Sequence, residues 1–116
     1  MSLRIHHIAL RARDPRVTER FYRSVLGLPV RRRDDGRGSV WLDAGGVIVM
    51  IEQAADDEPS PAPGTLELVA FAVDDREAWR ARIAAAGVAV EDETPHTLYF
   101  RDPDGRRVAV STYGFG

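Results

Sequence analysis

The sequence contains no cysteine, which excludes a disulfide scaffold, a cysteine-ligated zinc site and a thiol nucleophile. It also lacks a long apolar run: the longest, Val47 to Ile51, is far shorter than the ~20 residues of a membrane helix. Neither sign of charge dominates, because 16 basic residues, all of them arginine, stand against 18 acidic ones. The resulting net charge of −2 offers no basic face for nucleic acid. We therefore expect no nucleic-acid partner and no membrane association.

The chain is long enough and apolar enough to form one folded domain, since 116 residues with 44% hydrophobic content can bury a core. Charged and polar residues at Arg4, His6 and His7 interrupt the N-terminus before a signal peptide's apolar segment can form. We therefore expect a cytoplasmic location.

The two halves of the chain repeat one order of predicted elements. Each half opens with an apolar run that ends in aspartate, His7 to Asp14 and then Leu68 to Asp75. A helical pattern follows each run and stops at Gly27 and at Gly87, where a left-handed residue can end a helix. Repetition at this scale predicts two copies of one supersecondary unit.

Three short strands complete each unit. They comprise a strand directly after the helix, an aromatic strand that meets an Asp/Gly turn, and a last strand. The predicted strands are Leu28–Val30, Val40–Asp43 and Val47–Glu52 in the first half, and Val88–Val90, Tyr99–Arg101 and Arg107–Thr112 in the second. The sequence therefore predicts an α+β fold of two tandem βαβββ modules. We place module one at residues 3–53, a linker at 54–64 and module two at 65–114, all within a single domain, 1–116.

Both predicted helices have recognisable N-termini. Asp14 is a good N-cap and Pro15 suits the first helical position, where its missing N–H costs nothing. In the second half either Asp74 or Asp75 caps the helix. Apolar stripes should face the sheets: Val17, Phe21 and Val25 in the first helix, and Trp79, Ile83 and Ala86 in the second.

Alternation along the strands predicts which side chains share the face that the helices leave open. In the first half these are Ile5, His7, Ala9 and Arg11 with Ile48, Met50 and Glu52; in the second they are Leu68, Ala70 and Ala72 with Tyr99, Arg101, Arg107, Ala109 and Ser111. We expect the two open faces to enclose one groove, the candidate functional site.

Three segments carry a resemblance to a known family: His6–Leu10, Phe21–Leu28 and the Tyr-Phe-Arg-Asp-Pro-Asp-Gly run at Tyr99–Gly105. With the paired βαβββ modules, they make the chain resemble the vicinal oxygen chelate superfamily. That superfamily includes glyoxalase I, bleomycin-resistance proteins, extradiol dioxygenases and fosfomycin-resistance enzymes. The resemblance covers nearly the whole chain and implies curved mixed sheets around a groove. It implies the fold and the superfamily, not the reaction.

Enzymes of this superfamily usually hold a divalent metal on His or Glu side chains from the first and last strands of each module. The resemblance places these ligands at His7, Met50, Leu68 and Ala109. Leucine and alanine have no lone pair to offer, and methionine is a soft ligand. Glu52, further along the face of Met50, completes at most a His7/Glu52 pair. We predict no cofactor, the alternative being Zn, Ni, Mn or Fe on this pair.

The favoured function is a metal-free small-molecule-binding protein of the bleomycin-resistance type, expected by resemblance to be a homodimer. The predicted ligand-binding residues are His7, Arg11, Trp41, Met50, Glu52, Leu68, Ala70, Tyr99, Arg101 and Ala109.

An enzyme is the alternative, with His7 and Glu52 as its candidate catalytic residues. It would be a lactoylglutathione lyase-like or dioxygenase-like enzyme with a metal, or an isomerase or epimerase. In the last case His7 or Glu52 is the general base, and Arg11 or Arg101 stabilises an enolate oxygen. A third possibility is an assembly or regulatory domain.

Several of these residues also have a purely structural interpretation. His7 suits a hydrogen-bonded position on a cavity wall, Glu52 a solvent-facing strand end, and Trp41 a core position. The run Arg31–Arg33 predicts a solvated edge strand, and the acidic, proline-rich segment 54–64 predicts an exposed linker without packing.

Overall fold

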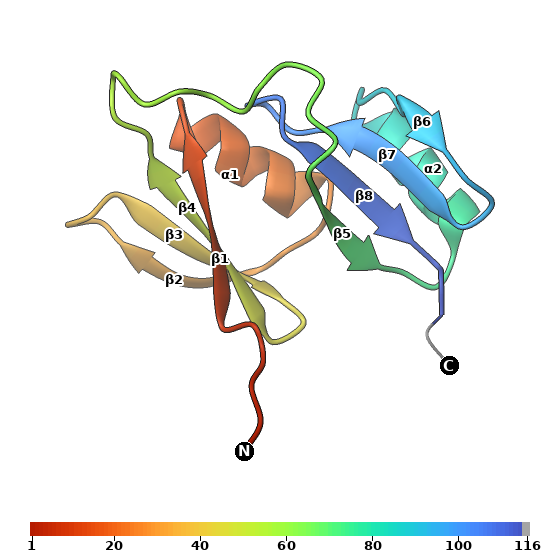
Figure 1. Ribbon diagram of the computed structural model, residues 1–116, viewed down its shortest axis with the longest axis horizontal. Helices are drawn as coiled ribbons and strands as arrows, with labels where there is room; N and C mark the ends of the chain where they lie inside the picture. Colours follow the sequence, from red (N-terminus) through yellow and green to blue (C-terminus); the bar gives the residue numbers. More distant parts are fainter. Residues whose placement is uncertain (115–116) are drawn as a thin grey trace. The chain divides into compact units, whose positions relative to one another are not determined.

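The protein consists of two four-stranded mixed sheets, each accompanied by one helix. A computed structural model describes residues 1–114 (Figure 1). The chain divides into two compact units, Met1–Ser60 and a second that begins at Pro61, so the division falls inside the predicted linker. Both units have the order βαβββ, which confirms the predicted α+β fold. No helix within residues 1–114 is long and apolar enough to cross a membrane.

The first unit is a four-stranded sheet with a helix across one face (Figure 1). The sheet has the order β1-β4-β3-β2, with β1 parallel to β4 and the other pairs antiparallel. This order puts β2 at an edge. The elements are β1 (His7–Ala12), α1 (Pro15–Ser24), β2 (Val30–Asp34), β3 (Ser39–Ala44) and β4 (Val47–Gln53).

The second unit repeats this topology with the order β5-β8-β7-β6. Strand β5 is parallel to β8, whereas β7 pairs antiparallel with both β8 and β6. The elements are β5 (Leu68–Ala72), α2 (Arg76–Ala85), β6 (Asp92–Glu93), β7 (Thr97–Arg101) and β8 (Arg107–Ser111).

The helices begin and end where the sequence indicates. Asp14 caps α1 by accepting a hydrogen bond from the Arg16 amide, and Asp75, not Asp74, caps α2 through the amide of Ala78. Gly27 and Gly87 have positive φ angles of 73° and 76°, which only glycine adopts without strain.

The buried stripes of the two helices differ from the prediction. In α1, Phe21 and the following Val25 are buried as predicted, but Val17 is 39% exposed and its neighbour Thr18 is buried instead. In α2, Ile83 is the single buried residue, and Ala86 beyond the helix is exposed. The prediction assumed an ideal helical period, whereas the burial in α1 is shifted by one residue from Val17 to Thr18.

The strand after each helix starts later than predicted, at Val30 instead of Leu28 and at Asp92 instead of Val88. Helix termination is the cause. The amide of Leu28 donates to the carbonyl of Tyr22, and that of Val88 donates to the carbonyl of Ile83. These amides close the last helical turns and are therefore not available to a sheet.

The linker is not free of contacts, which corrects the prediction for its first part. Arg11 on β1 donates from Nε and Nη2 to both carboxylate oxygens of Glu58, at 2.9 to 3.1 Å. Arg13 donates from Nη1 to the carbonyl of Ala55 at 2.8 Å and from Nε to Ser60. Segment 54–60 is therefore tied to β1 by the arginines that leave the strand.

This attachment depends on pH. The hydrogen bond from Arg11, and next the amide of Ala55, lower the pKa of Glu58 below its ordinary value. Because the folded pKa is the lower one, the contribution is present above the unfolded value of ~4.3 and is lost as pH falls through the folded pKa. We expect Glu58→Ala to accelerate hydrogen exchange at the Ala55 amide severalfold at pH 7, with the melting temperature little changed. Exposed Asp57→Ala is the control, and equal exchange in both variants would contradict the attachment.

Candidate functional site

A pocket of about 360 Å³ lies on the face of the first sheet that faces away from α1. Strand alternation puts its floor there: Val49 and Ile51 are buried beneath the helix, and Met50 between them points the other way. The lining residues are His6, His7, Arg32, Asp34, Arg37, Ser39, Trp41, Ile48, Met50 and Glu52.

The pocket brings together four residues that the sequence predicted for ligand binding: His7, Trp41, Met50 and Glu52. Their strands place them. Trp41 on β3 is directly opposite Met50 on β4, and His7 on β1 is opposite Ile48 on β4. An indole, a thioether and an aliphatic side chain thus form an apolar floor, and polar groups surround it. This combination is typical of small-molecule sites.

His6 and His7 contact each other through their ring nitrogens. The two Nδ1 atoms are 3.0 Å apart, and the rings meet edge to face. One of the two Nδ1 atoms must therefore carry a hydrogen and donate a hydrogen bond to the other. His6 precedes the first residue of β1, so strand alternation does not decide its face, and it lines the pocket beside His7.

Glu52 belongs to a small charged network at the end of the pocket. Its carboxylate is 3.5 Å from Nη1 of Arg11, the residue opposite it on β1. Arg11 also forms the bidentate pair with Glu58, which is the main reason that the pKa of Arg11 is raised. Arg11 lies on the predicted face, but its guanidinium is committed to two carboxylates. Its role as a ligand anchor stays a prediction.

The sequence missed the basic side of the pocket. Arg32, Asp34 and Ser39 line it because β2 pairs with β3 so that Arg32 is opposite Trp41 and Asp34 is opposite Ser39. The prediction that Arg31–Arg33 form an edge strand is correct in placement. The predicted strand ended at Val30, however, so its alternation was never extended to these arginines. Pairing residues 31–34 with the strand that contains Trp41, as the two arms of a hairpin, would have placed Arg32 on the face of Trp41.

Trp41 itself has an unusual polar environment. Its Nε1 is buried and has no hydrogen-bond acceptor among the described residues. The guanidinium carbon of Arg32 lies 5.4 Å from the centre of the indole ring, within the range of a cation–π contact. Trp41 is therefore a partly exposed platform in the pocket and not the core aromatic of the alternative interpretation.

The remaining predicted residues belong to the second unit. Leu68, Ala70, Tyr99 and Ala109 lie on one face of its sheet, because β5 and β7 both pair with β8 at matching positions. Leu68 is 37% exposed and Ala109 is fully buried. That this face and the pocket of the first unit form one groove stays a prediction.

Two arginines dominate this face of the second sheet. Arg101 donates to the carboxylate of Glu91 and to the carbonyls of Thr65 and Gly105, so its donors stabilise the unit itself. Arg107 lies with its guanidinium carbon 4.1 Å from the centre of the Tyr99 ring. The predicted contacts of Arg101 and Tyr99 with a ligand therefore compete with contacts that the protein makes internally.

The residues at the expected metal positions do not fit a divalent metal. Among His7, Met50, Leu68 and Ala109, only the histidine offers a nitrogen or oxygen donor. Within residues 1–114, no three His, Asp or Glu side chains are arranged to hold a metal ion. The pocket itself thus offers the His7/Glu52 pair of the alternative prediction, and the same two side chains are the candidates for proton transfer.

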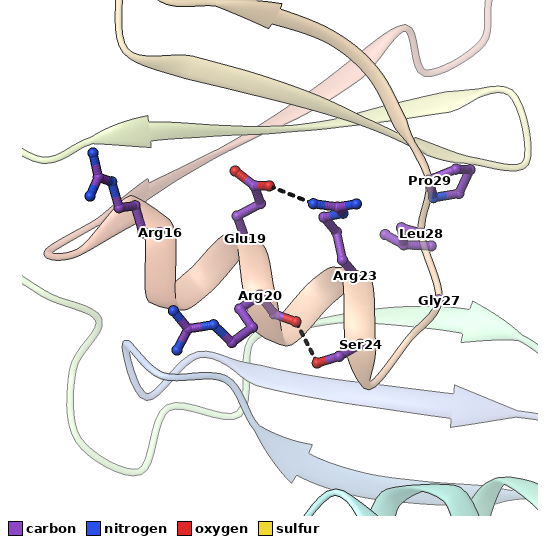
Figure 2. A pocket seen from close by; sticks show the side chains of 8 residues that line it. All are labelled: Arg16, Glu19, Arg20, Arg23, Ser24, Gly27, Leu28 and Pro29. Atoms are coloured by element: carbon purple, nitrogen blue, oxygen red, sulfur yellow. Dashed lines mark hydrogen bonds and ion pairs between the residues drawn. The ribbon is translucent and has the colours of Figure 1, made fainter.

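A larger pocket of about 580 Å³ lies along α1 and contains none of the predicted residues (Figure 2). Glu19 is its only carboxylate, and it is paired with Arg23 at 3.1 Å and with Arg33 at 2.6 Å. These hydrogen bonds, that of Arg33 above all, lower the pKa of Glu19. The lining is a charged helix surface with only Leu28 and Pro29 as apolar groups, so it lacks the apolar floor of the pocket on the sheet.

Paired βαβββ units with a pocket on an open sheet face define a class of small α+β proteins. The sequence model of the Glyoxalase/Bleomycin resistance protein/Dioxygenase superfamily matches residues 4–110, and the chain belongs to this superfamily. It is 31% identical over 115 residues to the uncharacterized protein YaeR of Escherichia coli K12, an alignment that covers 87% of this chain and 89% of YaeR.

Two solved structures illustrate the range of the superfamily. Lactoylglutathione lyase from Agrobacterium tumefaciens is 29% identical, with a TM-score of 0.72 and coverage of 95% of this chain and 93% of that one. The fosfomycin resistance protein FosX from Listeria monocytogenes has a TM-score of 0.85 over 99% of this chain and 94% of its own, at 20% identity. The second likeness concerns the fold alone.

Proposed function

We propose that this protein binds a small molecule in the pocket on the first sheet, without a metal, in the manner of bleomycin-resistance proteins. The single observation that carries the proposal is the pocket of about 360 Å³ in which Trp41 and Met50 form an apolar floor within a polar rim. The donor set supports a metal-free site, because Leu68 and Ala109 occupy positions where the superfamily's enzymes use ligands. Apolar residues there also avoid the cost of burying unneutralised carboxylates. The homodimer expected from the resemblance belongs to the same proposal.

The second candidate is an enzyme that uses His7 and Glu52, and one observation favours it. Both side chains line the same pocket, and each has a partner, His6 or Arg11, that orients it. An isomerase or epimerase of this kind would need one of them as a general base beside a carbon acid. The 29% identity to a lactoylglutathione lyase is compatible with this chemistry, although that enzyme's own reaction is not thereby transferred.

Elemental analysis and calorimetry of one purified sample test the proposal. We expect metal content far below one ion per chain, and saturable binding heat from at least one member of a panel of glycopeptide-like antibiotics and small aromatic acids. Trp41→Ala should abolish that heat because it removes the platform. Trp79→Ala, the other tryptophan, on α2, is the matched control and should leave it unchanged.

The opposite results are equally clear. A stoichiometric metal that disappears in His7→Ala would overturn the metal-free proposal and favour the enzyme. Absence of heat from the whole panel would count against small-molecule binding in this pocket.

A further inference from the structure

We infer that the molecule bound by this pocket is an aromatic carboxylate, with its ring on Trp41 and its charge between Arg32 and Arg37. This inference rests on the proposed function and goes beyond it by naming the ligand's chemical class. It follows from the charges that the pocket leaves uncompensated.

The carboxylates of the pocket already have partners. Glu52 lies 3.5 Å from Nη1 of Arg11, a residue outside the lining that it shares with Glu58. Asp34 accepts a hydrogen bond from the backbone amide of Arg37 at 3.2 Å, as part of the turn between β2 and β3. Each carboxylate of the lining thus has a hydrogen-bond or ion-pair partner within the protein.

The guanidinium groups, by contrast, are unpaired. Within residues 1–114, neither Arg32 nor Arg37 has a carboxylate oxygen within 4.0 Å, whereas the neighbouring Arg31 pairs with Asp43 and Arg33 with Glu19. Two guanidinium groups of the lining are thus left without a carboxylate partner in the described part of the chain, and an anionic ligand would supply one. A planar guanidinium binds a carboxylate through two parallel hydrogen bonds.

Trp41 supplies the second half of the recognition. Arg32 contacts the Trp41 ring at 5.4 Å from its centre, so a flat ligand that takes its place on the indole keeps its substituents within reach of the displaced guanidinium. A volume of about 360 Å³ is at the small end of ligand sites and suits one or two fused rings.

Calorimetry with four named probes tests this charge selection on the wild-type protein. The probes are 2-naphthoate, its neutral isostere 2-naphthamide, the cation 2-naphthylmethylamine and the saturated anion cyclohexanecarboxylate. We expect naphthoate to bind at least tenfold more tightly than each of the others, with an affinity that falls as salt rises.

Matched variants locate the charge. Arg32→Gln and Arg37→Gln should each weaken naphthoate binding about tenfold and leave naphthamide unchanged. Arg31→Gln removes the same charge from the same strand outside the pocket lining, and should change neither.

The outcomes separate the two proposals. Tighter binding of the amide or the amine, or equal losses in Arg31→Gln and Arg32→Gln, would overturn the inference while leaving small-molecule binding intact. If no probe binds at millimolar concentration, the aromatic-carboxylate assignment is wrong, and the proposed function then depends on the broader antibiotic panel alone.

Discussion

Replacing Asp102 by alanine should destabilise the protein by about 3 kcal/mol, the loss typical when one partner of a buried ion pair is removed. The Asp102 side chain is fully buried in the turn between β7 and β8. Its Oδ1 accepts hydrogen bonds from the amides of Asp104 and Arg106, and its Oδ2 accepts one from Arg106 Nη1 at 2.6 Å. Alanine would leave all three donors without this acceptor. Thermal unfolding should show a melting temperature lower by about 10 °C.

Two further variants attribute the loss to the carboxylate. Asp102→Asn keeps an acceptor for the two amides but turns a donor toward Arg106, so it should lose roughly half as much. In the double variant Asp102→Ala/Arg106→Ala, the total loss should be smaller than the sum of the two single losses, because each single variant already removes the same ion pair. Additive losses, or a single-variant effect below about 1 kcal/mol, would contradict this account of the turn.

Replacing Ile83 by alanine should cost about 3 kcal/mol, within the range for truncating a fully buried isoleucine. The reason is an asymmetry between the helices. Helix α1 has three buried side chains, whereas α2 has only Ile83, which has no exposed surface. Truncation removes the one fully buried side chain of α2 and leaves a cavity there.

Fluorescence separates local loosening of α2 from global unfolding. In a Trp41→Phe background, Trp79 reports on α2, where Arg82 covers its ring at 5.1 Å. Chemical denaturation monitored at Trp79 should show the loss for Ile83→Ala and only about 1 kcal/mol for Ile83→Val, which removes one methyl group. Equal effects of the two variants would mean that the packing of α2 does not depend on this side chain.

Much of this architecture could be predicted from the sequence because it depends on local signals. Asp14 and Pro15 define the start of α1, Gly27 and Gly87 define the ends of the helices, and the repeat supplies the order of strands. Strand alternation alone was sufficient to place His7, Met50 and Glu52 on one face. These features require only nearest-neighbour geometry.

The missed features depend on pairing between distant segments. Arg32 enters the pocket only through the register of β2 against β3, and this register is shifted by an irregularity between Val30 and Arg32. The bidentate pair of Arg11 with Glu58, 47 residues away, was likewise not predicted. Neither contact produces a repeating pattern in the sequence, because each one joins only two residues that are not close neighbours along the chain.

The position of β2 at the edge of its sheet gives its arginines a second consequence. An edge strand offers unpaired backbone groups to any other extended chain, and charged side chains along it disfavour such pairing. Arg31, Arg32 and Arg33 supply charged side chains of this kind, and Arg32 also lines the pocket. Selection for a different ligand charge at this strand would therefore meet a solubility constraint, because neutral side chains there would make the molecule more prone to aggregate.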